Sequence, residues 1–281
     1  MNLFVNAGSH TSVLRRTFLK ASIALSTGST LLIATASNAN NAMAVNRSAR
    51  MRALSQRFTK VKAQQLLLGS SDAITDLLIS IEKTIAANMQ FLTSTVTDIK
   101  GKQLVDQLRE QSIALLKFSA PLATKDSVIA TNRISNDVLK TANDLTAVLE
   151  VVAKTKDVKL VNLAGRQRML SQRMAKQHFL VAAAIEDKST FATIDSDRAA
   201  FIEALKALGE SSLTTPAIKD ELAKVGAMFK RYELLLADRS EKGMAKPQII
   251  LIAAMSEQLL ATCHEITIQF EMLATAKETS A

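Results

Sequence analysis

Apolar residues recur along most of the chain at intervals of three and four positions, the spacing that puts them on one face of an α-helix. The clearest run consists of Ile74, Leu77, Leu78, Ile81 and Ile85. Hydrophobic residues make up 48% of the chain, and only 8 Gly and 3 Pro interrupt it. We therefore expect a sizeable core and helical structure almost throughout.

Breaks in this pattern predict four helices in each half of the chain. In the first half the breaks fall at residues 69–71, at 100–101 and at Pro121, and they predict helices over about 45–68, 72–99, 102–120 and 125–152. In the second half they fall near residues 214–216 and 242–243. The first predicted helix of this half contains the second repeat of the pattern and ends near residue 187, and the other three cover about 195–209, 217–239 and 247–274. Neither Pro nor Gly separates the fourth helix from the fifth, so one continuous helix through residues 154–160 is left open. Short turns between amphipathic helices favour an all-α fold of two tandem up-and-down four-helix bundles, over residues 45–158 and 159–281.

Two segments of fifteen residues share a pattern that also involves polar positions. They read NRSARMRALSQRFTK over 46–60 and NLAGRQRMLSQRMAK over 162–176, and eight of the fifteen positions are identical. We call them the first and the second motif. Weaker echoes follow at nearly the same offset, since LVDQLREQSIALLKF resembles IKDELAKVGAMFKRY and SNDVLKTANDLT resembles SEQLLATCHEIT. The pattern predicts a tandem duplication.

Each motif places one arginine, Arg52 or Arg168, on an unusual helix face. At 100° per residue, the neighbours on that face are small or hydrogen-bonding side chains rather than leucines. They are Ser48, Ala49, Ser55, Gln56 and Thr59 in the first motif and Ala164, Gly165, Ser171, Gln172 and Ala175 in the second. Another helix could approach closely there, and a guanidinium suits a small oxyanion or carboxylate. The alternative is that both arginines lie on the surface beside small packing residues.

The other four motif arginines fall away from this face. They are Arg50, Arg57, Arg166 and Arg173, and we expect them to be solvated or paired with acids.

The second motif resembles the signature helix of the PilJ/NarX-type sensor domains, periplasmic four-helix modules of type IV pilus chemotaxis transducers and nitrate/nitrite sensor kinases. In the nitrate sensors, the resemblance implies a nitrate held between two copies of this helix across a dimer axis. Gly165 and Arg168 match the family's conserved glycine and its nitrate-contacting arginine. In the first motif Arg52 matches the arginine, but Ala49 replaces the glycine. The wording RQRMLSQR is closer to the pilus-transducer branch, for which the motif does not define the ligand.

We therefore expect a stand-alone periplasmic binding protein of the sensor type, with a small anion such as nitrate or nitrite between the two motif helices. The candidate ligand-binding residues are Arg52, Arg168, Gly165, Ala49, Ser55, Ser171, Gln56 and Gln172. The helices pair either within one chain or between the chains of a homodimer. The alternative function is that of a helical adaptor for a membrane chemotaxis or type IV pilus transducer, without a small ligand. Either function requires a signalling partner, such as a membrane sensor kinase or a chemotaxis transducer, because no transmitter region is recognisable.

The first 44 residues resemble a twin-arginine export signal. They contain RRTFLK from Arg15, a modestly apolar run over 21–36 and small residues up to Ala44, after which we expect cleavage. The expected location is therefore the periplasm. An uncleaved amino-terminal membrane anchor is the alternative, although the run is short and polar for a span.

Charge and composition narrow the classes of function. Loss of three basic residues with the signal lowers the net charge from +9 to +6, and aromatic residues make up only 4% of the chain, so no nucleic-acid surface is expected. The single cysteine, Cys263, is expected to be a buried, inert thiol. His178 and His264 lack the spacing of metal ligands and are not close in sequence to the motif serines. We expect neither a metal or cofactor nor an enzymatic activity.

Overall fold

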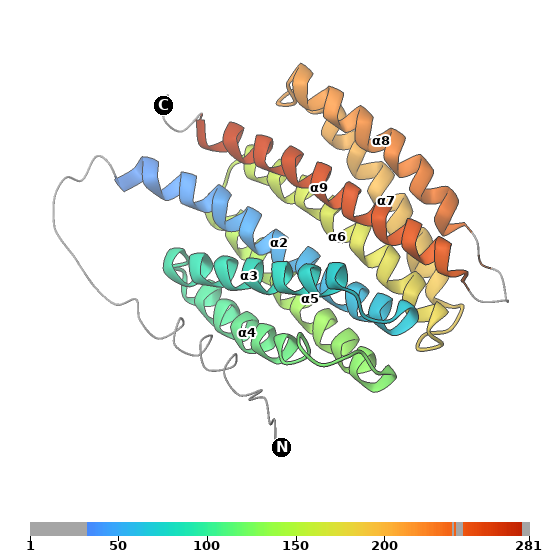
Figure 1. Ribbon diagram of the computed structural model, residues 1–281. Helices are drawn as coiled ribbons and strands as arrows, with labels where there is room; N and C mark the ends of the chain where they lie inside the picture. Colours follow the sequence, from blue (N-terminus) through green and yellow to red (C-terminus); the bar gives the residue numbers. More distant parts are fainter. Residues whose placement is uncertain (1–32, 238, 240–243, 277–281) are drawn as a thin grey trace. The chain divides into compact units, whose positions relative to one another are not determined.

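The computed structural model describes residues 33–237, 239 and 244–276. Within these ranges the chain forms eight α-helices and no strand, which confirms the predicted all-α helical bundle (Figure 1). The helices are α2 (Ile33–Leu68), α3 (Asp72–Thr95), α4 (Ile99–Leu116), α5 (Lys125–Ala153), α6 (Lys156–Ala182), α7 (Thr190–Glu210), α8 (Pro216–Leu236) and α9 (Lys246–Ala276). From Thr35 onward they pack as one compact unit.

Hydroxyl and carboxylate side chains define where most of these helices begin. The first turn of a helix leaves backbone N–H groups without partners, and a side-chain oxygen just before it can accept from one of them. Such caps precede five helices and are provided by Ser71, Asp98, Thr124, Thr155 and Thr215. The helix starts predicted near residues 72, 125 and 217 are confirmed to within one residue.

The predicted break at residues 100–101 is wrong. The chain bends at residues 96–98 instead, and Gly101 lies in the first turn of α4, where its N–H donates to the Asp98 carboxylate at 2.8 Å. A Cβ on Gly101 would come within 2.6 Å of the Val96 side chain. This glycine therefore permits a tight bend before the helix rather than a break inside it.

Helices α5 and α6 are separate, which resolves the alternative left open by the sequence. Lys154 adopts a left-handed conformation with φ 55°, and Thr155 then caps α6 by accepting from the Val158 N–H. Helix α6 ends at Ala182, earlier than predicted, and Ala184 follows with φ 51°. The turn predicted at residues 242–243 lies outside the described residues.

Most of the predicted export signal also lies outside the described residues. Helix α2 begins at Ile33, so it starts before the predicted cleavage position rather than at residue 45. Ala42 and Ala44 are buried in the core. The last part of the predicted signal thus continues into the first motif helix without interruption.

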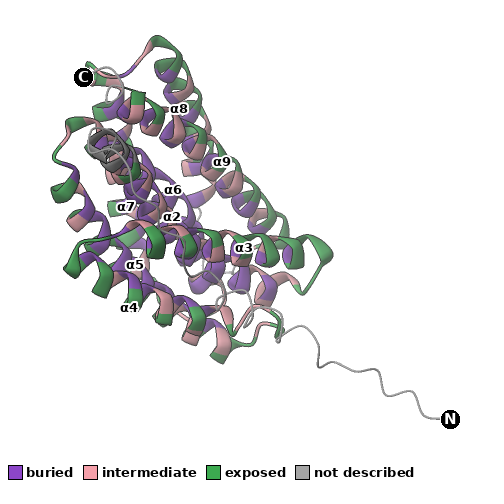
Figure 2. Cartoon of the chain, turned by 90° about the vertical axis from the view of Figure 1, so that its left-hand side faces the viewer, coloured by how far each residue is buried: buried purple, intermediate pink, exposed green. Residues whose placement is uncertain are grey.

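The two motif helices, α2 and α6, are buried on nearly all sides. From Met51 to Ala63 only Arg57 is not buried, and from Ala164 to Leu180 the exceptions are Arg166 and Arg173. Figure 2 shows purple along α2 and α6 but green on the outward faces of α4 and α8. Because many of the enclosed side chains are polar, they need hydrogen-bond partners from several neighbouring helices.

Helix α9 combines an apolar composition with contacts to both halves of the chain. By length and composition alone it could cross a membrane, but 39% of its most apolar window is buried inside the bundle. Interior helices of soluble bundles meet the same criteria. In Figure 1, α2 lies between α3 and α9, and the Lys60 ammonium on α2 donates to the Ser256 hydroxyl on α9 at 3.0 Å.

Helices α2 and α6 make a close contact at Ala49 and Gly165. A Cβ built on Gly165 would lie 2.9 Å from the Ala49 Cβ, closer than side-chain carbons normally come. The alanine methyl group therefore fills the space that the glycine leaves. The sequence feature that predicted close approach, small residues beside each arginine, is found at this crossing.

We expect Gly165→Ala to lower the free energy of unfolding by about 1–3 kcal/mol, the usual cost of overpacking a tight interior. Gly226→Ala in α8 provides a matched control, because nothing lies within 4 Å of the added Cβ. There the substitution should raise stability by about 0.5–1 kcal/mol, because glycine is a poor helix former. Urea unfolding of the three proteins measures both effects, and an equal gain in both variants would contradict the close crossing.

Candidate functional site

Arg52 and Arg168 meet at this crossing. Their exposed fractions are only 4% and 1%. The Nη2 atoms of Arg168 and Arg52 lie 3.0 and 3.8 Å from the position that a Cβ on Gly165 would occupy. The structure thus brings four of the predicted site residues together, the two arginines with Ala49 and Gly165.

Each guanidinium donates to the asparagine that opens the other motif. Arg52 Nη2 lies 2.5 Å from Asn162 Oδ1, and Arg168 Nη2 lies 2.7 Å from Asn46 Oδ1. The two contacts are reciprocal, since asparagine and arginine occupy the same positions in both motifs. The sequence analysis noted the shared asparagines as part of the repeat but did not assign them to the site.

The asparagines in turn connect the arginines to two glutamates. Asn162 Nδ2 donates to Glu150 at 2.9 Å, and Asn46 Nδ2 donates to Glu271. We call Arg52–Asn162–Glu150 and Arg168–Asn46–Glu271 the two relays. In each relay a neutral amide separates the positive from the negative group, so the arginine charge is balanced at a distance and not by a direct ion pair.

Each arginine has one more hydrogen-bond acceptor, but one nitrogen of Arg168 has none among the described residues. Arg52 Nη1 donates to Asn143 Oδ1, and Arg168 Nη1 contacts His264 Nδ1, both at 3.0 Å. Burial, together with Arg168 and two further arginines, lowers the pKa of His264 to about 3, so its neutral ring can accept this bond. The Nε atom of Arg168 is buried and has no hydrogen-bond partner among the described residues.

Burial is also the main cause of the lowered pKa values of Arg52 and Arg168. It lowers the pKa of Arg168 to about 9, with repulsion from Arg50 and Arg52 contributing. It lowers the pKa of Arg52 to about 10, with repulsion from Arg166 contributing. Both side chains stay charged at neutral pH, and no carboxylate of a described residue forms an ion pair with either. The crossing therefore encloses two positive charges whose hydrogen-bond partners among the described residues are neutral.

The remaining predicted site residues make their hydrogen bonds elsewhere. Ser55 and Ser171 donate to the backbone carbonyls of Arg52 and Arg168, within their own helices. The other two residues, Gln56 and Gln172, donate to the carbonyls of Ser135 on α5 and Ser256 on α9. The two glutamines fix the motif helices against their neighbours, although both of their carbonyl oxygens are buried without a partner among the described residues.

Directly after Gln56, Arg57 and the residue one turn further on, Lys60, share the carboxylate of Glu257 on α9. Arg57 forms two hydrogen bonds with it, and the Lys60 ammonium contacts it at 2.5 Å. We call these three residues the Glu257 cluster. In the second motif Arg173 pairs with Asp197 on α7, while Lys176 donates to Asn132 and Asn136 on α5. The pairing of Arg57 and Arg173 with acids and the exposure of Arg166 agree with the sequence prediction. Arg50 differs, because it is partly buried and forms no ion pair with an acid among the described residues.

The single cysteine and possible metal ligands were also considered in the sequence analysis. Cys263 is buried, and burial raises the pKa of its thiol to about 12, as an unreactive cysteine requires. Within the described part of the chain, no group of three or more His, Cys, Asp or Glu side chains is placed to hold a metal ion.

Fold and site together define an all-α helical bundle whose two buried motif helices cross through reciprocal arginine contacts. Residues 152–257, from the end of α5 into α9, match the family model described as type IV pili methyl-accepting chemotaxis transducer N-term (PilJ). The resemblance of the second motif to the pilus-transducer branch is thereby confirmed. The first motif lies outside the matched residues. No match was found among curated proteins or solved structures.

We expect Glu257→Gln to destabilise the protein, because it leaves the fully buried Lys60 ammonium without its anion. Breaking a buried ion pair typically costs about 3–5 kcal/mol. Although burial raises the pKa of Glu257, the charges and hydrogen bonds of Lys60 and Arg57 lower it to about 2. The contribution of the carboxylate is therefore complete above the ordinary value of 4.5 and is lost as the pH falls toward 2.

Urea unfolding from neutral pH to about pH 2 measures this effect. The difference between Glu257→Gln and the parent protein should be largest above pH 4.5 and should shrink below it. Glu221→Gln is a suitable control, because Glu221 pairs with the exposed Lys224 and such surface pairs contribute about 0–1 kcal/mol. A constant difference across this pH range would contradict the assigned role of Glu257.

Proposed function

We propose that the protein is a sensor-type binding module that holds a small anion between α2 and α6, with Arg52 and Arg168 as the principal donors. The observation that carries the proposal is the meeting of two buried guanidiniums that have only neutral acceptors within hydrogen-bond distance. Two like charges in such a place repel each other, and an anion between them removes the repulsion. The unpartnered Nε of Arg168 offers a further donor.

In this proposal the asparagine oxygens stand where oxygen atoms of the ligand would bind. Asn46 and Asn162 each present one neutral oxygen to an arginine. An oxyanion presents several oxygens and a full negative charge to both arginines at once. Binding therefore exchanges two contacts with neutral amide oxygens for hydrogen bonds in which donor and acceptor are both charged, and the released amides remain bonded to Glu150 and Glu271.

Nitrate or nitrite is the ligand suggested by the NarX-type part of the resemblance. Both are small oxyanions, and the residues in contact at the crossing, Ala49 and Gly165, are small. The match to the pilus-transducer family supports a sensory role and leaves the ligand undefined. We therefore take nitrate and nitrite as the first anions to test.

We also infer that the chain arose by tandem duplication, which would place both halves of the site in one molecule. Corresponding contacts support this: the two relays, the bonds of Gln56 and Gln172, and the positions of Asn143 and His264 all repeat between the halves. A homodimer with sites between chains remains the alternative arrangement. Export to the periplasm and signalling through a membrane transducer belong to the same proposal.

The test introduces a carboxylate of the chain itself at the place where the anion is proposed to bind. In the double variant Asn162→Asp/Glu150→Gln, the relay keeps its hydrogen bonds and its net charge, but a carboxylate now contacts Arg52 directly. We expect the parent protein to gain thermal stability with millimolar nitrate or nitrite, by about 2.7 kcal/mol at a hundredfold excess over Kd. The double variant should fold and should lose most of that stabilisation. Its affinity for the anion should be at least tenfold lower than that of the parent protein.

Gln103→Glu/Glu110→Gln, which moves one negative charge between two exposed positions of α4 and keeps the net charge, is the matched control. Calorimetric titration should give the control the affinity of the parent protein. Unchanged affinity in the double variant, or no stabilisation of the parent protein by any small oxyanion, would refute the proposed site. Capture of a membrane transducer without an anion effect would instead support the adaptor function.

A further inference from the structure

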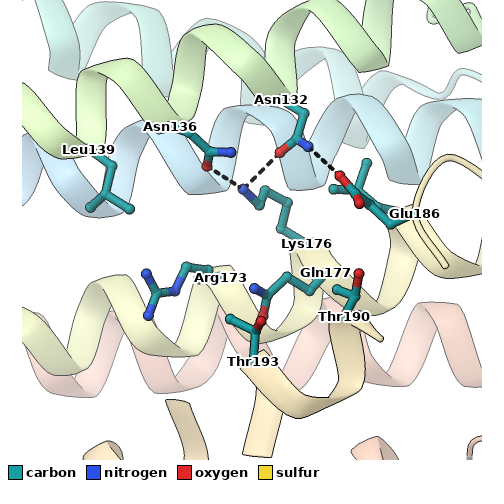
Figure 3. A pocket seen from close by; sticks show the side chains of 10 residues that line it. Asn132, Asn136, Leu139, Arg173, Lys176, Gln177, Glu186, Thr190 and Thr193 are labelled. Carbon is teal, nitrogen blue, oxygen red and sulfur yellow. Dashed lines mark hydrogen bonds between the residues drawn. The ribbon is translucent and has the colours of Figure 1, made fainter. Parts of the chain in front are cut away.

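A cavity of about 350 Å³ lies between α5, α6 and α7, away from Arg52 and Arg168 (Figure 3). Lys176 and Arg173 on α6 form one wall, and Asn132 and Asn136 on α5 face them. Glu186 lies beside Asn132. The volume is in the range of sites for small organic ligands.

Lys176 is the unusual member of this wall, because it is only 3% exposed. Its Nζ donates to Asn132 Oδ1 and Asn136 Oδ1, both at 2.9 Å. An ammonium has three N–H donors, so two amide oxygens do not satisfy it. Among the described residues no carboxylate lies within ion-pair distance of this ammonium. The positive charge of Arg173 is taken up by Asp197, which leaves Lys176 as the uncompensated charge of the cavity.

The first motif shows what a balanced version of this arrangement looks like. Lys60 occupies the same motif position as Lys176, and it contacts the Glu257 carboxylate and the Ser256 hydroxyl. In the alignment of the closing segments, Ser256 corresponds to Ser135, so Glu257 corresponds to Asn136. The Glu257 cluster therefore contains a carboxylate where the Lys176 side has an amide and a cavity.

We propose that this cavity is a second binding site, in which the carboxylate of a small amino acid contacts Lys176 as Glu257 contacts Lys60. The amide oxygens of Asn132 and Asn136 hold the ammonium in place, and the Asn136 Nδ2 group can donate to the ligand at the same time. Glu186 accepts one hydrogen bond, from Asn132 Nδ2 at 3.0 Å, and a carboxylate can accept several more. It is therefore placed to receive the ligand's ammonium group.

Electrostatics supports this assignment of the ligand. Burial and the nearby Arg173 lower the pKa of Lys176 to about 7, against the opposing influence of Glu186 and Asp197. A bound carboxylate stabilises the charged form of the lysine. A simple anion would face the negative Glu186 without a group to neutralise it, whereas an amino acid matches both charges. This site is separate from the crossing of the motif helices and does not depend on the function proposed above.

The experiment uses calorimetric titration of the full chain with the common amino acids, with acetate as a probe that lacks the ammonium group. We expect saturable binding of at least one amino acid and at least tenfold weaker binding of acetate. Asn136→Glu should abolish binding, because it builds the carboxylate of the Glu257 cluster into the chain. It should also keep the protein folded, with an unchanged or higher melting temperature.

Two controls separate the outcomes. Gln103→Glu adds the same charge at an exposed position on α4, and Asn162→Asp/Glu150→Gln alters only the motif crossing, so both should bind the amino acid as the parent protein does. If Asn136→Glu fails to fold, Lys176→Met removes the charge and should cause the same loss. Binding that survives in a folded Asn136→Glu or Lys176→Met protein, or the absence of binding by any amino acid, would overturn the proposal. Loss of binding only in the double variant would assign the ligand to the crossing instead.

Discussion

The structure depends on the need to satisfy two arginines that are enclosed where two helices touch. A buried charge without partners is costly, and a direct carboxylate would neutralise the positive site entirely. The protein uses an intermediate solution, in which an asparagine from the opposite helix accepts from each arginine and passes the interaction to a glutamate. Because each arginine depends on the other helix, α2 and α6 cannot separate or slide without exposing both charges. The flanking helices α5 and α9 are held by the same requirement, since they carry the two glutamates.

The two halves differ at the positions where the environment differs. Ala49 faces Gly165, so one methyl group occupies a space that two would overfill. Asn143 accepts from Arg52 where the neutral His264 accepts from Arg168. The largest difference separates the closed Glu257 cluster from the open cavity at Lys176. A pseudosymmetric framework thus supports two chemically distinct surroundings for the same motif.

The sequence was sufficient for the features that depend on local or periodic signals. Apolar spacing gave the helices, and the repeated small residues identified the face where α2 and α6 meet. It was insufficient at Gly101, where the sequence predicted a helix break. The Asp98 side chain caps α4 by accepting from the Gly101 N–H, so the glycine lies inside the first turn of that helix. The sequence was also insufficient where the partner is distant in sequence. Nothing near Lys60 or Lys176 indicates that these lysines are buried, because their partners belong to α9 and α5. The relays were missed for the same reason, although the shared Asn46 and Asn162 were visible in the repeat.

The connection between the halves consists of Lys154 and Thr155 alone. Lys154 turns the chain through a left-handed conformation and Thr155 caps α6, so both residues have a fixed conformation and the connection is short. Joining two binding surfaces through so short a tether makes their encounter intramolecular, at an effective concentration far above that of free proteins. The crossing of α2 and α6 therefore stays assembled at any dilution of the protein, whereas the same contact between separate chains would weaken as their abundance falls.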